Sequence, residues 1–237
     1  MAAVDIAKNE AAALMQQMPQ KVADMSNILA TKFVATSLTE VEQSFKEAMG
    51  STSEPASNAV MVDIVSSVRS EVAFSLKCLQ ILSRWIWLMT PEAEDGNNFG
   101  VHVQQDVLKT IGTWIEKLEK ELKLAPEYFK ERAAVAEKMA PKISRTKTVS
   151  KSKKNDGSET KEESTEAEDE KSEEARSPAI PDQAAHLLAI DLQYYTLMEM
   201  GISSARDALL IVEHIISKNE KKITEPKGSE KRSNFSY

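Results

Sequence analysis

The chain has 237 residues with only 7 glycines and 8 prolines, which favours helix over sheet, and its formal net charge of −7 argues against nucleic acid as a partner of the body. The single cysteine, Cys78, lies in an apolar helical run, which favours a buried thiol in a reducing compartment over a disulfide or a nucleophile. No secretory signal is visible at the N-terminus, and the most apolar run, 81–89, is too short for a membrane span and contains Arg84.

The first two predicted helices cover residues 3–48 and 57–89. Helical spacing of apolar residues favours one long helix over 3–48, although Ser37-Leu38-Thr39-Glu40 fits a capping box, so a restart there is the alternative. Residues 50–55 predict a loop. The second helix carries one continuous apolar stripe, made of Met61, Ile64, Val65, Val68, Val72, Leu76, Leu79, Leu82 and Ile86.

A glycine- and asparagine-rich stretch, 91–101, follows the second helix. Pro91 ends that helix, and Gly and Asn accept the backbone of tight turns, so a loop between two long helices is expected. Trp85 and Trp87 lie just before it, and packing in the core or in a subunit interface is favoured for them over a ligand site.

The third predicted helix covers residues 101–140 and would be on the order of 50 Å long. Pro126 is expected to kink this helix without ending it, and Pro141 to end it. The predicted core face consists of Val107, Ile111, Trp114, Ile115, Leu118, Leu122, Phe129, Ala133 and Ala136.

Residues 142–178 are first basic and then acidic, and they hold too few apolar groups to offset the entropy of ordering, so disorder is expected. A tolerated insertion is the favoured interpretation, with a regulatory or tethering role as the alternative; the basic third is the only candidate for localisation or nucleic-acid contact. The fourth helix, 181–223, precedes a polar, flexible tail, 224–237, that ends in Phe235-Ser236-Tyr237. The apolar stripe of this fourth helix consists of Leu188, Leu192, Tyr195, Ile202, Leu209, Val212 and Ile216.

Four long amphipathic helices predict an all-α four-helix bundle. The wide stripes leave residual apolar surface, which favours side-by-side oligomerisation. The three histidines, His102, His186 and His214, stand on different segments with no second ligand at metal-binding spacing, and no phosphate-binding glycine motif is present. We therefore expect no catalytic residue, no metal site and no cofactor.

Two features remain as candidates for function. Glu94 and Asp95 precede a helix N-terminus, where the macrodipole stabilises acids. The other feature is the tail, because a terminal carboxylate can be captured by a lysine or by backbone amides of a partner.

The string Glu94-Asp95-Gly96-Asn97-Asn98-Phe99-Gly100-Val101 resembles the activation loop of the 11S (REG) proteasome activator family. Nearby features agree with the resemblance: a long helix on either side, Gln104 and Gln105 after the loop, Lys221-Lys222 late in the last helix, and the terminal Tyr237. The similarity extends from the second helix to the C-terminus, apart from the insert.

The resemblance implies an ATP-independent activator of the 20S proteasome that forms a homo-heptameric ring of four-helix bundles and is not an enzyme. Its implied partners are the proteasome α-subunit ring and further copies of itself, with no nucleic acid and no membrane. The tail would dock between two α subunits, where the carboxylate of Tyr237 would meet a lysine, while the loop opens the gate. The implied loop contacts are Glu94, Asp95, Gly96, Asn97, Asn98, Phe99, Gly100, Val101 and His102, and the implied docking residues are Phe235, Ser236 and Tyr237.

The chain departs from animal members of that family, which place their variable insert between the first two helices and an aliphatic residue before the final Tyr. This pattern suggests a divergent, protozoan-like member. The cytoplasm is the expected compartment, with the nucleus left open. Without the resemblance, a helical scaffold or adaptor that binds partner helices is the alternative, and a helical-bundle enzyme comes third.

Overall fold

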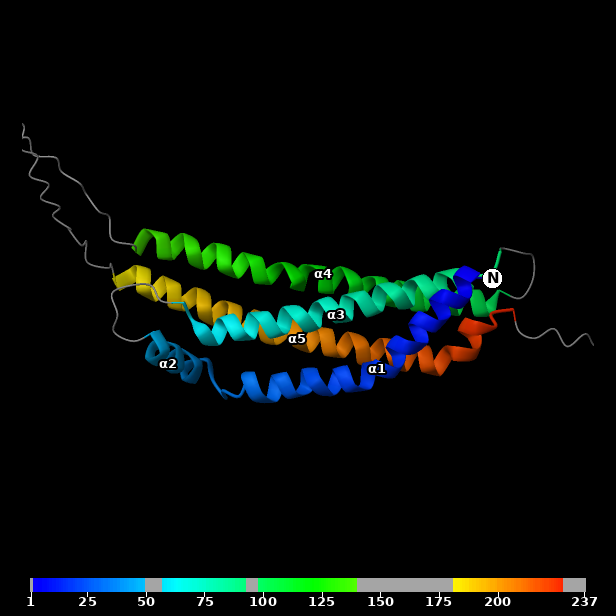
Figure 1. Ribbon diagram of the computed structural model, residues 1–237, viewed down its shortest axis with the longest axis horizontal. Helices are drawn as coiled ribbons and strands as arrows, with labels where there is room; N and C mark the ends of the chain where they lie inside the picture. Colours follow the sequence, from blue (N-terminus) through cyan, green and yellow to red (C-terminus); the bar gives the residue numbers. More distant parts are fainter. Residues whose placement is uncertain (1, 50–56, 93–97, 140–180, 228–237) are drawn as a thin grey trace, which may run out of the picture.

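A computed structural model describes residues 2–49, 57–92, 98–139 and 181–227, and all regular structure in these ranges is α-helical. The molecule is a long rod in which α3, α4 and α5 lie side by side, with α1 and α2 along one flank (Figure 1). In order along the chain, the helices are α1 (Ala2–Lys32), α2 (Leu38–Met49), α3 (Ala59–Met89), α4 (Phe99–Met139) and α5 (Pro181–Thr224).

The prediction of one helix over 3–48 is wrong, and the alternative, a restart of the helix near Ser37, is correct. The first helix stops at Lys32 and a new one begins at Leu38. The backbone amide of Thr36 donates to a carboxylate oxygen of Glu40 at 2.9 Å, and the amide of Glu40 faces the hydroxyl of Ser37 at 3.4 Å. These bonds give partners to amides at the helix start that have none inside the helix, and they therefore stabilise the start of a second helix there.

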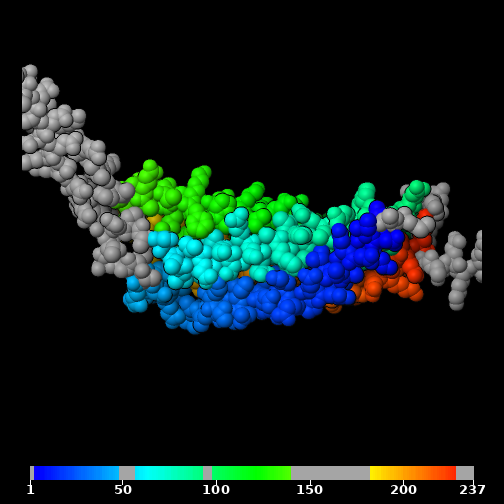
Figure 2. Space-filling model, in the orientation of Figure 1, coloured from blue at the N-terminus to red at the C-terminus, as the bar shows by residue number. Residues whose placement is uncertain are grey.

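The predicted four-helix bundle is confirmed, with α1 and α2 together in its first position. In the described part of the chain, α3 and α5 are neighbours and both lie beside α1 and α4, whereas the backbones of α1 and α4 are not neighbours. In cross-section the bundle is therefore a diamond, with α3 and α5 across its short diagonal. The space-filling view shows α1 and α3 covering much of one face of the rod (Figure 2).

The apolar stripes predicted for the second and fourth helices form the core. Eight of the nine stripe residues of α3 are buried, and Leu76 packs against them. Trp85 is buried as well, whereas Trp87 is 68% exposed. Within the described residues, no helix is long and apolar enough to cross a membrane.

The predicted face of α4 is wrong beyond Pro126, although the helix continues through this proline as expected. Phe129 is 46% exposed, and the neighbouring Tyr128 is fully buried in its place. The Tyr128 hydroxyl donates to Asp191 Oδ1 at 2.9 Å, and its ring lies 5.3 Å from that of Tyr194. A polar partner on α5 thus decides which of two adjacent aromatic residues faces the core. Ala133 is exposed too, and Arg132 and Val135 are buried instead.

Asp191 is fully buried and joins three helices at the end of the rod where α4 stops and α5 begins. Its carboxylate accepts hydrogen bonds from Asn58 Nδ2 at 3.0 Å, from the Tyr128 hydroxyl and from Arg132 Nε at 3.0 Å. Asn58 also caps α3, because its Oδ1 accepts from the amide of Met61 at 3.2 Å. Burial, together with the Asp191 carboxylate, raises the pKa of Tyr128, so its phenol stays a donor. We call the end of the rod where α4 stops and α5 begins the far end.

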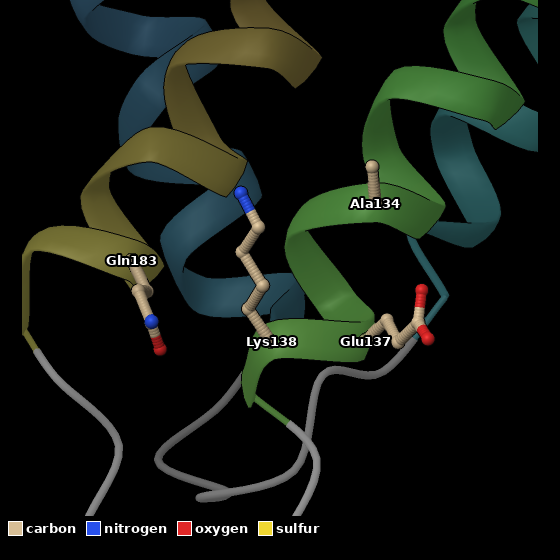
Figure 3. Close-up of a pocket in the computed structure, with 4 residues that line it drawn as sticks. All are labelled: Ala134, Glu137, Lys138 and Gln183. Carbon is tan, nitrogen blue, oxygen red and sulfur yellow. The ribbon is translucent and has the colours of Figure 1, made fainter.

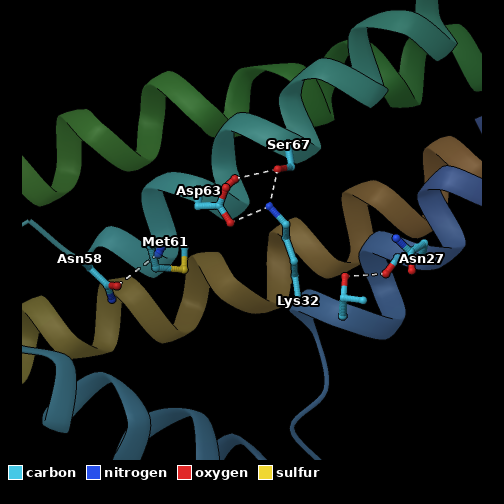
Figure 4. A network of polar contacts seen from close by, with 7 residues as sticks. Asn27, Lys32, Asn58, Met61, Asp63 and Ser67 are labelled. Carbon is cyan, nitrogen blue, oxygen red and sulfur yellow. Dashed lines mark hydrogen bonds and ion pairs between the residues drawn. The ribbon is translucent and has the colours of Figure 1, made fainter.

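A second polar contact ties α1 to α3 (Figure 4). Lys32, the last residue of α1, donates to Asp63 Oδ2 and to the hydroxyl of Ser67, both at 2.6 Å. The same view shows the Asn58 cap one turn before Asp63. The end of α1 is therefore held against the first turns of α3 on the side away from α4.

Candidate functional site

The end of the rod opposite the Asp191 network carries the described parts of the two segments that the sequence singled out. Of the predicted loop contacts, Asn98, Phe99, Gly100, Val101 and His102 are described, while Glu94, Asp95, Gly96 and Asn97 lie outside the described residues, as do Phe235, Ser236 and Tyr237. Here α3 ends, α4 begins and α5 ends, and we call this the loop end (Figure 1).

The helix after the loop begins at Phe99, two residues earlier than predicted. The carbonyl of Asn98 accepts from the amide of His102 at 3.0 Å, so Asn98 lies at the N-cap position. Phe99, Gly100, Val101 and His102 therefore form the first turn of α4 rather than an irregular loop. Their positions are fixed by the helix that follows them.

On the other side of the loop, α3 ends as the sequence predicts. Thr90, the C-cap residue, is extended, with φ −71° and ψ 121°, as expected for the residue before Pro91. The amide of Thr90 donates to the carbonyl of Trp87 at 3.1 Å, and its hydroxyl donates to the carbonyl of Ile86 at 3.2 Å. Both bonds serve carbonyls in the last turn of α3 and hold the start of the loop.

Gly100 is required by close packing rather than by a turn, which corrects the role that we predicted for it. A Cβ at this position would lie 2.1 Å from the carbonyl oxygen of Pro226 and 2.5 Å from its Cα. Both are backbone atoms of the segment after α5, so no side-chain rotation makes room. Glycine therefore lets the start of α4 lie directly against the chain that leaves α5.

Gln104, one turn further along α4, is completely buried. Its Nε2 donates to the carbonyl of Ile223 at 2.8 Å and to the carbonyl of Met89 at 3.2 Å. One carboxamide thus joins the C-terminal turns of α3 and α5 to the first turns of α4. In the sequence, Gln104 is marked only by the resemblance of the loop region and by its place as a polar side chain one turn before the core residue Val107.

A third contact joins the same two helices at the surface. The ammonium group of Lys222 lies 5.2 Å from the centre of the Phe99 ring, within the range of a cation–π interaction. Phe99 is 62% exposed, so this contact contributes little to stability but orients the ring beside the end of α5. Lys221 and Lys222 are both exposed in the last turn, where positive charge suits the helix dipole.

The histidines and the cysteine of the described residues are not grouped into a metal site. His102, His186 and His214 are exposed on separate turns, and no group of three His, Cys, Asp or Glu in the described ranges could hold a metal ion. Cys78 is fully buried, and burial raises the pKa of its thiol to about 11, so it is not a nucleophile at neutral pH.

A hollow of about 570 Å³ lies at the far end, between the last turns of α4 and the start of α5. It is lined by Ala134, Glu137, Lys138 and Gln183. The side chains of Glu137 and Lys138 point in different directions and do not converge on one point (Figure 3). The hollow is open to solvent and is not built like an enclosed ligand site.

Comparison with known proteins finds a family whose match includes the residues of the loop end. The family model "Proteasome activator PA28, C-terminal" matches residues 55–149 and 142–233. Human and chicken proteins named Proteasome activator complex subunit 3 are each 25% identical over 173 residues, which are 73% of this chain and 54% of the relative. The chain therefore spans about half the length of the curated relatives it matches.

Two solved structures share the fold. The 11S subunit of the Plasmodium falciparum proteasome, PA28, matches with a TM-score of 0.65 and 15% identity, over 95% of this chain and 91% of that one. A chain from an archaeal 20S proteasome in complex with a mutated P26 activator matches with a TM-score of 0.64 and 14% identity, over 95% and 94%. At this identity the two structures establish the helical architecture alone.

Proposed function

The chain belongs to the PA28 family of proteasome activators, and from this premise we propose that it is an ATP-independent activator that docks on the α-subunit ring of the 20S proteasome and opens its gate. One observation carries the proposal. The family match spans the loop and most of the tail, and the loop end brings the start of α4 and the end of α5 into direct contact.

In this proposal the tail and the loop have different roles. Phe235, Ser236 and Tyr237 dock the subunit, with the terminal carboxylate of Tyr237 paired to a lysine of the proteasome. The loop, residues 94–102, contacts the gate. A single tail offers little contact area, but several tails on one ring bind together, and the effective concentration multiplies their affinity. The loop then needs only a higher affinity for the open gate than for the closed one.

Exposed apolar side chains on two helices support a ring. Trp87 and Val62 are 25 residues apart on α3 and share one helix face; Met200 and Ile211 are 11 residues apart on α5 and share another. Since α3 and α5 lie across the short diagonal of the bundle, their outer faces point to opposite sides. Two different patches on opposite sides suit a head-to-tail contact, which forms a ring when the rotation between successive subunits closes. We propose that this ring is a homo-heptamer.

The first test is hydrolysis of a short fluorogenic peptide by purified 20S proteasome, with and without this protein and without ATP. We expect strong stimulation that disappears when Ser236 and Tyr237 are deleted. Light scattering on the same samples should give about 184 kDa, which is seven times the 26.3 kDa of one chain. A ring that does not stimulate contradicts the proposed partner, and a monomer that does not stimulate supports the helical adaptor instead.

A substitution in the loop separates switching from docking. Replacing Asn97 by a bulky residue should leave binding to the proteasome intact and remove the stimulation, because only the gate contact is lost. Deletion of the two terminal residues should remove both. Loop variants that lose binding, together with tail variants that keep it, would show that the roles are assigned the wrong way round.

A further inference from the structure

We propose that Gln104 is a positioning residue, which holds the loop in register with the tail so that docking places the loop against the gate. The proposal rests on the proposed function. Its structural basis is one buried carboxamide at the point where three helix ends meet. We call residues 89–92 and 98–99 the loop stems, and residues 223–227 the tail stem.

The hydrogen bonds of Gln104 go to groups that the helices themselves leave unpaired. Met89 is the last residue of α3 and Ile223 the next to last of α5, and the carbonyls in a final helical turn have no partner inside the helix. Gln has two amide protons on one nitrogen and carries no charge, so it can serve two carbonyls at once. The side chain comes from α4, so it places both stems of the loop relative to the tail stem.

These bonds fix position in a way that apolar packing does not. The next core residues along α4, Val107 and Ile111, touch their neighbours without a preferred direction. A hydrogen bond weakens steeply when its geometry is changed, and in a buried site it has no water to replace it. The Oε1 of Gln104 is buried without a hydrogen-bond partner among the described residues, so stability alone does not explain a polar side chain here.

Two further contacts join the same parts of the chain. The backbone of Pro226, in the tail stem, lies against Gly100, in the first turn of α4. The ammonium of Lys222 lies over the ring of Phe99. The loop stem and the tail stem are therefore joined by contacts of Phe99 and Gly100 as well as by Gln104, and we expect them to move as one body.

Docking through the tail can then be converted into a defined position of the loop. If the loop is no longer held in a fixed position relative to the tail, the tails still bind, but the loop contacts the gate in the active position for only part of the time. The affinity of docking would change little, whereas the maximal stimulation would fall. This split distinguishes a positioning role from a general loss of stability.

The test is Gln104→Met, which keeps the length of the side chain and removes both hydrogen bonds. In a titration of 20S proteasome, we expect the maximal stimulation to fall severalfold, since each lost hydrogen bond of typical net strength shifts the equilibrium between the positioned and the displaced loop by roughly fivefold. The half-saturating concentration should change by less than about twofold.

Tyr128→Phe is the matched control. It removes a buried hydrogen bond to Asp191 at the far end, so thermal unfolding should show a comparable loss of stability while the maximal stimulation stays at the wild-type value. If Gln104→Met stimulates like the wild type, or if Tyr128→Phe loses as much stimulation, the positioning role is refuted.

A second measurement does not depend on the proteasome. Hydrogen exchange should become faster in residues 89–92, 98–100 and 223–227 of Gln104→Met, all together, and should not change there in Tyr128→Phe. A wild-type protein that fails to stimulate would contradict the proposed function while leaving this comparison intact. If hydrogen exchange in the loop stems or in the tail stem is the same in Gln104→Met as in the wild type, the inference is wrong.

Discussion

Gly100→Ala is the sharpest test of the contact between the start of α4 and the segment after α5. The added Cβ would lie 2.1 Å from the Pro226 carbonyl oxygen, and ordinary contact begins at 3.4 Å. The two backbones must therefore separate by about 1.3 Å, the difference between these distances. Because the three nearest atoms all belong to the backbone of Pro226, rotation of a side chain cannot absorb the change.

Two opposing effects set the free energy of unfolding of this variant. Alanine favours the helix by about 0.5–1 kcal/mol over glycine, whereas overpacking costs about 1–3 kcal/mol. The net change is a loss of about 0–2.5 kcal/mol, which the bundle should survive. Gly112→Ala is the matched control, since the same helix gains the same methyl group there with no atom within 4 Å. It should be about 0.5–1 kcal/mol more stable than the wild type.

The assay is peptide hydrolysis by 20S proteasome at saturating activator, with urea denaturation of the same samples. A displacement near 1 Å between the loop and the tail should lower the maximal stimulation of Gly100→Ala by about tenfold, while Gly112→Ala stimulates like the wild type. The reasoning fails if both alanine variants gain the same stability and stimulate equally. That result would mean that the start of α4 does not press on Pro226.

Three further predictions concern buried ionisable groups. Asp191→Ala should lower the free energy of unfolding in urea by about 3–5 kcal/mol, because Asn58, Tyr128 and Arg132 all lose their hydrogen bonds to one buried carboxylate; a loss below about 1 kcal/mol would contradict the network. Cys78 should resist alkylation at about pH 8 in the native protein and react on unfolding, since burial raises its pKa to about 11; rapid native labelling would contradict its burial. Burial raises the pKa of Glu121 above its ordinary value of 4.5, so the folded state holds a proton that the unfolded chain releases, and stability falls as pH rises through that window. Glu121→Gln should therefore raise the melting temperature more at about pH 7 than at about pH 4, and an equal shift at both would refute the assignment.

The core faces could be predicted from the sequence because burial follows helical spacing. The stripe from Met61 to Ile86 is an example, since each member is set by its neighbours on the same helix. The break between α1 and α2 was harder to predict. Val41 and Phe45 are buried after the break just as the pattern of one continuous helix requires, so periodicity does not distinguish a straight helix from a bent one. Local hydrogen bonds of Thr36 and Glu40 decide between them.

Contacts between distant parts of the chain account for the other differences. Either Tyr128 or Phe129 could face the core by spacing alone, and Asp191, 63 residues away, selects Tyr128. The loop motif located the candidate site, yet the role of Gly100 depends on Pro226, which no local pattern indicates. The roles of residues 94–97 and 235–237 stay predictions, because these residues lie outside the described ranges.

The length of α4 has a consequence for how this protein can change. Its 41 residues place Met139 about 60 Å from Phe99, at a rise of about 1.5 Å per residue. The segment that connects α4 to α5 is attached at the far end, behind the Asp191 network. A reporter domain or an affinity handle joined directly after Met139 would be attached at the end of the rod opposite the loop end. Insertions at the far end of the rod can therefore be accepted without changing the structure of the loop end.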